Sequence, residues 1–246
     1  MKKAASFALG CKVNQYESEA IAELFAEKGY EIVGIDEEAD VYVINTCTVT
    51  NFGDKKSRQL IRKVKRQNEN AIVAVVGCYA QTAPKELMEI AGVNLVIGTK
   101  DRAQIVEMVE QYDRANGVEN HVSDIMKERV FEPLSIQKLA NRTRAYLKIQ
   151  DGCSQYCSYC IIPYARGPIR SREPQEVVAE VKRLAENGFK EVVLTGIHVA
   201  SYGKDRRDTS LLDILKQVHE VEGIERIRFS SIEPNVVTEE FAQTMA

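Results

Sequence analysis

The sequence contains no tryptophan, three histidines and six prolines among its 246 residues. The scarcity of histidine disfavours zinc sites that combine cysteine with histidine ligands. No apolar run reaches the length that a membrane-spanning helix needs. The net charge of −3 means that any contact with nucleic acid must come from a local basic patch. We therefore expect a soluble, cytoplasmic, globular protein without a membrane partner.

The six cysteines are too few for the disulfide scaffold of a chain this long. Cys153, Cys157 and Cys160 form a C-x3-C-x2-C array, and thiolates at such spacing suit an iron–sulfur cluster. Because a [4Fe–4S] cluster normally takes four protein ligands, three cysteines leave one iron open to a small molecule. A zinc knuckle is the alternative, although the array lacks a second C-x2-C unit and a nearby histidine.

Residues 1–115 alternate short apolar runs with stretches of helical periodicity. This alternation predicts an open parallel sheet with helices on both faces. Asn14 and Glu17 form a pattern typical of a capping box, and Gly29 is placed to end that helix. We expect strands at residues 4–9, 41–45, 71–76 and 95–97, and further helices at residues 54–68, 84–92 and 104–112.

A cysteine follows each of the three most apolar predicted strands. These cysteines are Cys11, Cys47 and Cys78. Because the carboxyl ends of parallel strands meet at one edge of a sheet, we expect the three thiols to converge there. Gly10 and Gly77 predict a close approach of the backbone to a bulky ligand. The alternative is three buried free cysteines, since cysteine is among the most buried residue types.

The predicted helix at residues 54–68 is strongly basic. Lys55, Arg58, Arg62 and Lys65 share one of its faces at helical spacing. Such a stripe is suited to neutralising RNA phosphates. A solvated helix face is an equally good interpretation.

Residues 116–141 are polar and irregular, and we interpret them as a linker to a second domain at residues 142–246. The cysteine array follows the first predicted strand of that domain, where α/β barrels carry active groups. Three strands cannot close a barrel, so we expect a partial barrel in an N-terminal fragment of a longer protein, or a half-barrel completed by a partner. The expected strands lie at residues 144–150, 192–195 and 226–230, and the helices at 174–187, 211–220 and 238–245.

Further polar residues stand near the predicted strand ends of the second domain. Arg166, Arg170 and Arg172 are candidates for binding an anionic cofactor or RNA, with surface charges as the alternative. We expect His198 to make local hydrogen bonds. We expect Glu233 to accept the amino group of a cofactor, with capping of the last helix as the alternative.

Several motifs together resemble the methylthiotransferases of the radical S-adenosylmethionine (SAM) superfamily. Tyr159 fills the aromatic position in a C-x3-C-x-aromatic-C signature. The other motifs are residues 10–19, 45–50 and 76–81. Within that group, the similarity is greatest to the tRNA threonylcarbamoyladenosine methylthiotransferases, and it is carried by residues 11–15, 151–153, 161–167 and 194–198. The resemblance covers essentially the whole chain.

This resemblance implies two [4Fe–4S] clusters and bound SAM. The C-x3-C-x2-C cluster would bind SAM and cleave it to a radical, with Tyr159, Gly196 and Glu233 as cofactor-binding residues. A cluster on Cys11, Cys47 and Cys78 would carry the sulfur. The implied reaction inserts a methylthio group at carbon 2 of threonylcarbamoyladenosine beside the anticodon. The implied partners are tRNA, an electron donor such as flavodoxin or ferredoxin, and a sulfur donor that the sequence does not identify; a C-terminal RNA-binding barrel of the TRAM type is also implied.

Other functions remain open at this point. Within the same family, the alternatives are methylthiolation of isopentenyladenosine in tRNA or of an aspartate in a ribosomal protein. An iron–sulfur electron-transfer protein would need the clusters but no SAM pocket. A zinc-containing RNA-binding module would need neither redox activity nor SAM.

Overall fold

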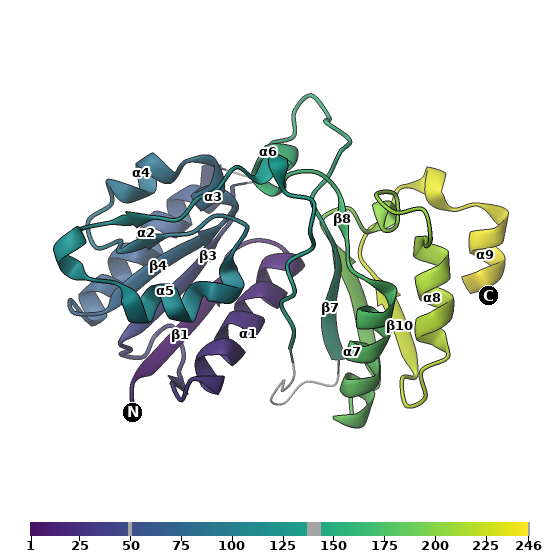
Figure 1. Ribbon diagram of the computed structural model, residues 1–246, viewed down its shortest axis with the longest axis horizontal. Helices are drawn as coiled ribbons and strands as arrows, with labels where there is room; N and C mark the ends of the chain where they lie inside the picture. Colours follow the sequence, from purple (N-terminus) through teal and green to yellow (C-terminus); the bar gives the residue numbers. More distant parts are fainter. Residues whose placement is uncertain (49–50, 137–143, 246) are drawn as a thin grey trace. The chain divides into compact units, whose positions relative to one another are not determined.

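The computed structural model describes residues 1–48, 51–136 and 144–245. These residues form two compact units (Figure 1). The first unit comprises Met1–Glu128 and Tyr156–Gly167, and the second comprises Arg129–Gln155 and Pro168–Ala246. Across the described ranges, no helix combines the length and apolar character required to span a membrane.

The first unit is built on a six-stranded sheet in the order β2-β1-β3-β4-β5-β6 (Figure 1). All neighbouring strands pair in parallel, which confirms the predicted open parallel sheet. Its central strands are continuous apolar runs, as expected for strands that are buried on both faces. The strands are β1 (Lys3–Ala8), β2 (Glu31–Ile32), β3 (Val41–Thr46), β4 (Ile72–Gly77), β5 (Leu95–Val96) and β6 (Glu119–Asn120).

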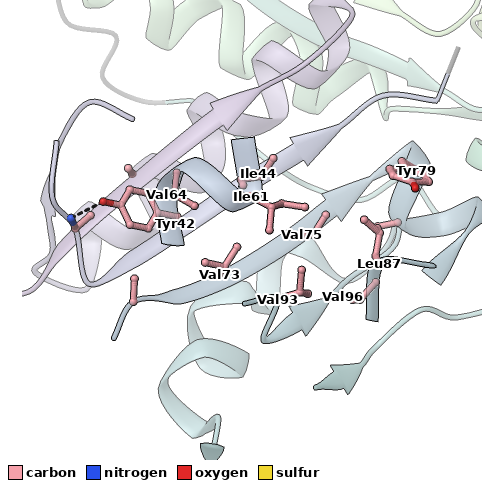
Figure 2. Packing of buried hydrophobic residues seen from close by; sticks show 14 residues of the cluster. Tyr42, Ile44, Ile61, Val64, Val73, Val75, Tyr79, Leu87, Val93 and Val96 are labelled. Carbon is pink, nitrogen blue, oxygen red and sulfur yellow. Dashed lines mark hydrogen bonds between the residues drawn. The ribbon is translucent and has the colours of Figure 1, made fainter. Parts of the chain in front are cut away.

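Helices cover both faces of this sheet because successive strand residues point to opposite sides. On β3, Tyr42 and Ile44 belong to a cluster with Ile61 and Val64 of α2 (Figure 2). The intervening strand residues pack on the other side with residues of α1 and α5. The helices of this unit are α1 (Lys12–Glu27), α2 (Asn51–Gln67), α3 (Cys78–Thr82), α4 (Pro84–Met88), α5 (Ile105–Gln111) and α6 (Ile162–Arg166), with short 3-10 helices η1 (Arg102–Gln104), η2 (Arg114–Asn116) and η3 (Ile125–Lys127).

The second unit contains a curled four-stranded sheet in the order β10-β9-β7-β8 (Figure 1). β7, β9 and β10 pair in parallel, as predicted for the first part of a partial barrel. The short β8 pairs antiparallel to β7 and was not expected. The elements are β7 (Arg144–Asp151), β8 (Arg170–Ser171), α7 (Pro174–Glu186), β9 (Glu191–Gly196), η4 (Val199–Ser201), α8 (Leu211–His219), β10 (Arg226–Phe229), η5 (Pro234–Val236) and α9 (Glu239–Met245).

Two segments belong to the first unit although the sequence suggested otherwise. β6 falls within the expected linker at residues 116–141. It belongs to the first unit because its backbone pairs with β5. Tyr156–Gly167 also belongs to this unit, since α6 packs on α3 and Thr99 Oγ1 donates a 2.7 Å hydrogen bond to the Ala165 carbonyl. Two of the three cysteines of the C-x3-C-x2-C array, Cys157 and Cys160, therefore belong to the unit that contains the N-terminal sheet.

Candidate functional site

Three cysteines follow the carboxyl ends of adjacent parallel strands in the first unit. Cys11 follows β1, Cys47 follows β3 and Cys78 follows β4. Neighbouring strands in a sheet are about 4.8 Å apart, so this topology brings three thiol-bearing loops to the same edge. Cys11 is exposed, Cys47 is partly buried and Cys78 is buried.

The glycines beside these cysteines are required by the protein's own packing. Gly10 has a φ of +101°, and a Cβ at this position would lie 2.7 Å from Cys47 Sγ. Gly77 has a φ of +95°, and its Cβ would lie 2.3 Å from Asn45 Oδ1. Left-handed backbone and a neighbouring side chain thus exclude other residues at both positions. The protein's own packing thus explains both glycines, and the close approach of a bulky ligand stays a prediction.

Asn14 is not part of a capping box. The helix α1 already begins at Lys12, with Cys11 as its N-cap residue, and no side chain caps it. Asn14 therefore lies within the first turn, where it is buried, and its amide donates to the carbonyls of Leu9 at 2.8 Å and Thr46 at 2.9 Å. These carbonyls stand just before the loops of Cys11 and Cys47. A single side chain thus holds two of the cysteine loops together.

Buried charges surround the third cysteine. The Arg166 side chain is fully buried, and its Nε donates to Cys78 Sγ at 3.1 Å. Its terminal nitrogens contact Glu17 Oε1 at 2.6 Å and Asn14 Oδ1 at 2.6 Å. Arg102, also fully buried, lies with its Nη1 2.7 Å from Glu17 Oε2. A carboxylate in α1 is thus shared by two guanidinium groups beside the cysteine.

The environment of Cys78 controls its protonation. Burial raises the pKa of the Cys78 thiol to about 11, although the charge and hydrogen bond of Arg166 act in the opposite direction. A thiol that is neutral at physiological pH must lose its proton when it binds a metal. Arg166 is the group placed to compensate the negative charge that this deprotonation creates.

The donor set fits an iron–sulfur cluster. Three thiols occupy adjacent strand ends, and a permanent cation contacts one of them. Within residues 1–48, 51–136 and 144–245, no three His, Cys, Asp or Glu side chains are already gathered around a metal position. Ligand side chains commonly gather as the metal binds, because binding and local ordering are coupled.

The C-x3-C-x2-C array extends over both compact units. Cys153 comes two residues after the end of β7 in the second unit, and it is buried. Cys157 is exposed and Cys160 is partly buried in the first unit, where the Cys160 amide donates to the Cys157 carbonyl at 2.9 Å. Tyr159 is 90% exposed, so its ring is open to a ligand or to solvent.

The strand end before Cys153 is held by buried polar contacts. Lys148 Nζ lies 2.9 Å from Asp151 Oδ2, and both side chains are buried. The other Asp151 oxygen accepts a 2.8 Å hydrogen bond from the Gly152 amide. Gln150 Nε2 donates to the carbonyls of Asp151 and Gly152, both at 2.7 Å. These contacts fix the backbone on which Cys153 is carried.

The candidate cofactor residues at the other strand ends contact residues of the protein itself. His198 Nδ1 lies 2.6 Å from Ser201 Oγ, which confirms the expected local hydrogen bond. His198 Nε2 also contacts Glu233 Oε1, which is 35 residues away in the sequence. Burial acts to raise the pKa of Glu233, but the hydrogen bond and charge of His198, together with a backbone hydrogen bond and the charge of Lys204, lower the pKa overall. A Cβ on Gly196 would lie 2.7 Å from Gln150 Oε1 and 3.1 Å from the Gln150 carbonyl oxygen, so packing disfavours a side chain at this position. A cofactor role for Gly196 and Glu233 stays a prediction.

The three arginines after the array are internal groups, and the surface-charge interpretation is wrong. Arg166, Arg170 and Arg172 are 0%, 3% and 4% exposed. Arg170 Nη2 lies 3.7 Å from Asp151 Oδ2, and Arg172 Nη2 lies 2.5 Å from Glu180 Oε2. Sequence reasoning singled out Arg166 without identifying its acidic partner. The feature of the sequence that could have identified this partner is Glu17, a carboxylate on the buried face of an otherwise amphipathic helix.

The basic stripe of α2 divides into two pairs. Lys55 and Arg62 are exposed. Arg58 Nη1 donates to the Tyr79 hydroxyl at 2.7 Å, and Lys65 Nζ donates to the carbonyls of Glu69 and Ala71. Burial lowers the pKa of Lys65, with a further contribution from the charge of Arg114. RNA contact by this stripe stays a prediction, and it is better supported for the two exposed residues.

Comparison with known proteins links both halves of the chain to one group of enzymes. Residues 3–98 match the uncharacterized protein family UPF0004, and residues 147–246 match the radical SAM superfamily. The chain is 51% identical over 246 residues to threonylcarbamoyladenosine tRNA methylthiotransferase MtaB of Bacillus subtilis, which covers 100% of this chain and 54% of the relative. It is 34% identical over 245 residues to tRNA-2-methylthio-N(6)-dimethylallyladenosine synthase of Dictyoglomus thermophilum, and the match covers 96% of this chain and 54% of that relative.

A solved structure shares the fold. The radical SAM methyltransferase TsrM from Kitasatospora setae, with tryptophan substrate and a SAM analogue bound, matches with a TM-score of 0.65 and 17% sequence identity. The match covers 100% of this chain and 57% of that one. The chain spans about half the length of the curated relatives it matches. Its two matched domains and its relatives along the whole sequence establish that it belongs to the radical SAM methylthiotransferase family.

Proposed function

We propose that the protein inserts a methylthio group at carbon 2 of threonylcarbamoyladenosine beside the anticodon in tRNA. The observation that carries this proposal is the 51% identity along all 246 residues with an enzyme of that name. Two separate sets of three cysteines provide the metal donors that such chemistry needs.

Each cysteine set has a distinct role in this proposal. Cys153, Cys157 and Cys160 hold a [4Fe–4S] cluster that supplies reductive cleavage of SAM when both are bound. Cys11, Cys47 and Cys78 hold a second cluster that carries the sulfur. The chain's own contribution is positional. Asp151 and Gln150 fix the backbone before Cys153, and Asn14 fixes the loops of Cys11 and Cys47.

The remaining residues provide contacts to substrate and cofactor. In this proposal SAM is contacted by the Tyr159 ring, which is exposed, and by Gly196 and Glu233. Lys55 and Arg62 are exposed cations on α2 and suit phosphates of tRNA. An electron donor such as flavodoxin or ferredoxin supplies the reducing equivalents. A tRNA substrate places the protein in the cytoplasm.

The function is tested by mass analysis of tRNA nucleosides from cells with and without the gene. The proposal requires that methylthiolated threonylcarbamoyladenosine disappears in the deletion strain and returns when the gene is restored. Persistence of that nucleoside at its normal level would refute the assignment. Loss of methylthiolated dimethylallyladenosine instead would establish the alternative supported by the 34% identical relative.

The second cluster is tested by metal analysis. Anaerobic reconstitution should give about eight irons per chain if both sets build cubane clusters. Replacing Cys153, Cys157 and Cys160 by Ala should leave about half of that iron. Zinc in place of iron in protein purified without oxygen would contradict the proposal and favour a zinc-containing module.

A further inference from the structure

Arg166 connects all three N-terminal cysteine loops, although it belongs to a different part of the sequence. It lies six residues after Cys160, on α6, and within the first compact unit. It contacts Cys78 Sγ directly through Nε at 3.1 Å. Through Nη2 it also contacts Asn14, whose amide holds the carbonyls before the Cys11 and Cys47 loops. One side chain thereby organises the whole set of strand ends.

The orientation of this guanidinium is fixed on several sides. Glu17 binds two of its nitrogens, at 2.6 Å and 3.1 Å, so that Nε remains directed at the sulfur. The backbone that carries it is fixed as well, because Thr99 binds the Ala165 carbonyl in a buried hydrogen bond. A planar guanidinium has donors in a rigid fork, so it can bind a carboxylate and a thiolate at the same time.

A buried cation next to a thiol has a specific electrostatic consequence. Burying an ionised arginine is unfavourable unless negative charge surrounds it. Glu17 is shared with Arg102, which lies 2.7 Å from the same carboxylate. A thiolate at Cys78 would add negative charge at the Nε position. The arrangement is therefore better matched to a metal-binding thiolate than to a neutral thiol.

We propose that Arg166 is a positioning residue of the Cys11/Cys47/Cys78 cluster. It aims Cys78 Sγ, compensates the thiolate charge and donates a hydrogen bond that tunes the cluster's reduction potential. This inference rests on the second cluster of the proposed function. It also makes the segment that follows the C-x3-C-x2-C array a structural part of the other cluster's site.

The test uses the protein with Cys153, Cys157 and Cys160 replaced by Ala, so that only the N-terminal cysteines bind iron. In this parent we compare Arg166→Gln and Arg166→Lys with Arg102→Gln as the matched control. Arg102 has equal burial and shares the Glu17 carboxylate. The readouts are iron retained against a chelator and the reduction potential followed by electron paramagnetic resonance.

Arg166→Gln should lower the affinity for iron by about 10- to 100-fold, as is typical when a group that orients a metal ligand is removed. The remaining cluster should become harder to reduce, because hydrogen bonds to sulfur raise cluster potentials. We expect at least a tenfold change in the one-electron equilibrium, which corresponds to about 59 mV. Arg166→Lys should recover part of both quantities, and Arg102→Gln should keep the parent's potential.

The outcomes separate this inference from the proposed function. A parent that binds no iron would overturn the second cluster and the inference with it. A parent that binds iron, with Arg166→Gln matching it in retention and potential, would overturn the inference alone. Arg102→Gln matching the losses of Arg166→Gln would also overturn it, by assigning them to the shared carboxylate. If Arg166→Gln fails to fold, as judged by circular dichroism, the Arg166→Lys potential decides: a parental value overturns the inference, and a lowered one supports it.

Discussion

Glu17 provides the sharpest test of how the first unit is held together. Its carboxylate is fully buried and lies 2.6 Å from Arg166 Nη1 and 2.7 Å from Arg102 Nη1. Glu17→Leu would preserve most of the side-chain volume but remove the charge, leaving two guanidinium groups without this carboxylate. Removing one partner of a buried ion pair costs about 3–5 kcal/mol. With two cations affected, we expect about 5 kcal/mol, a large part of the roughly 5–15 kcal/mol that stabilises a typical domain.

The assay is hydrogen exchange of the β3 and α1 amides, followed by mass spectrometry, because it reports the stability of this unit separately from the other. Glu27→Leu, an exposed position on the same helix, is the control and should change stability by less than about 0.5 kcal/mol. Replacing Glu17, Arg102 and Arg166 together by apolar residues should recover most of the loss, because no uncompensated charge then remains. A loss below about 1 kcal/mol for Glu17→Leu would refute this reasoning.

Three further predictions follow from the site. Well below pH 9 the Cys78 thiol is neutral in both the folded and the unfolded chain, but as the pH rises the unfolded chain ionises first. The stability of the metal-free protein, measured by denaturant titration, should therefore fall by about 2 kcal/mol between pH 9 and pH 11. A Cys78→Ala variant that keeps the whole loss would contradict the raised pKa of about 11. Replacing Lys55 and Arg62 by Gln should flatten the salt dependence of tRNA binding by about one unit of slope per lost phosphate contact, and an unchanged slope would assign both to solvent. Cys47→Ala should still cleave SAM to deoxyadenosine under a strong reductant but make no methylthiolated tRNA, whereas Cys157→Ala should lose both activities. Full methylthiolated product from a folded Cys47→Ala protein would exclude a sulfur-carrying role for the Cys11/Cys47/Cys78 cluster.

Local sequence patterns predicted the sheet and the edge at which three cysteines follow its strands. The apolar runs of β1, β3 and β4 are long enough to specify buried strands, and the alternation with helices makes those strands parallel. Parallel strands have their carboxyl ends on one side of the sheet. The sequence alone therefore predicted that Cys11, Cys47 and Cys78 lie at the same edge. The C-x3-C-x2-C spacing is equally local, because its chemistry depends on the short separation of three thiols.

Tertiary structure decided which polar groups support those cysteines. Asn14 matched a capping pattern, but an asparagine side chain can either cap its own helix or bind the loops of neighbouring strands. Because the helix begins at Lys12, Asn14 lies inside its first turn and binds the loop carbonyls instead. β6 has only two residues, so its place in the sheet depends on the backbone of β5 and leaves no periodic signal. Arg166 and Glu17 are 149 residues apart, and their contact exists only because α6 packs on the N-terminal unit. Pairing of buried charges over that distance is a property of the folded chain, which no local pattern encodes.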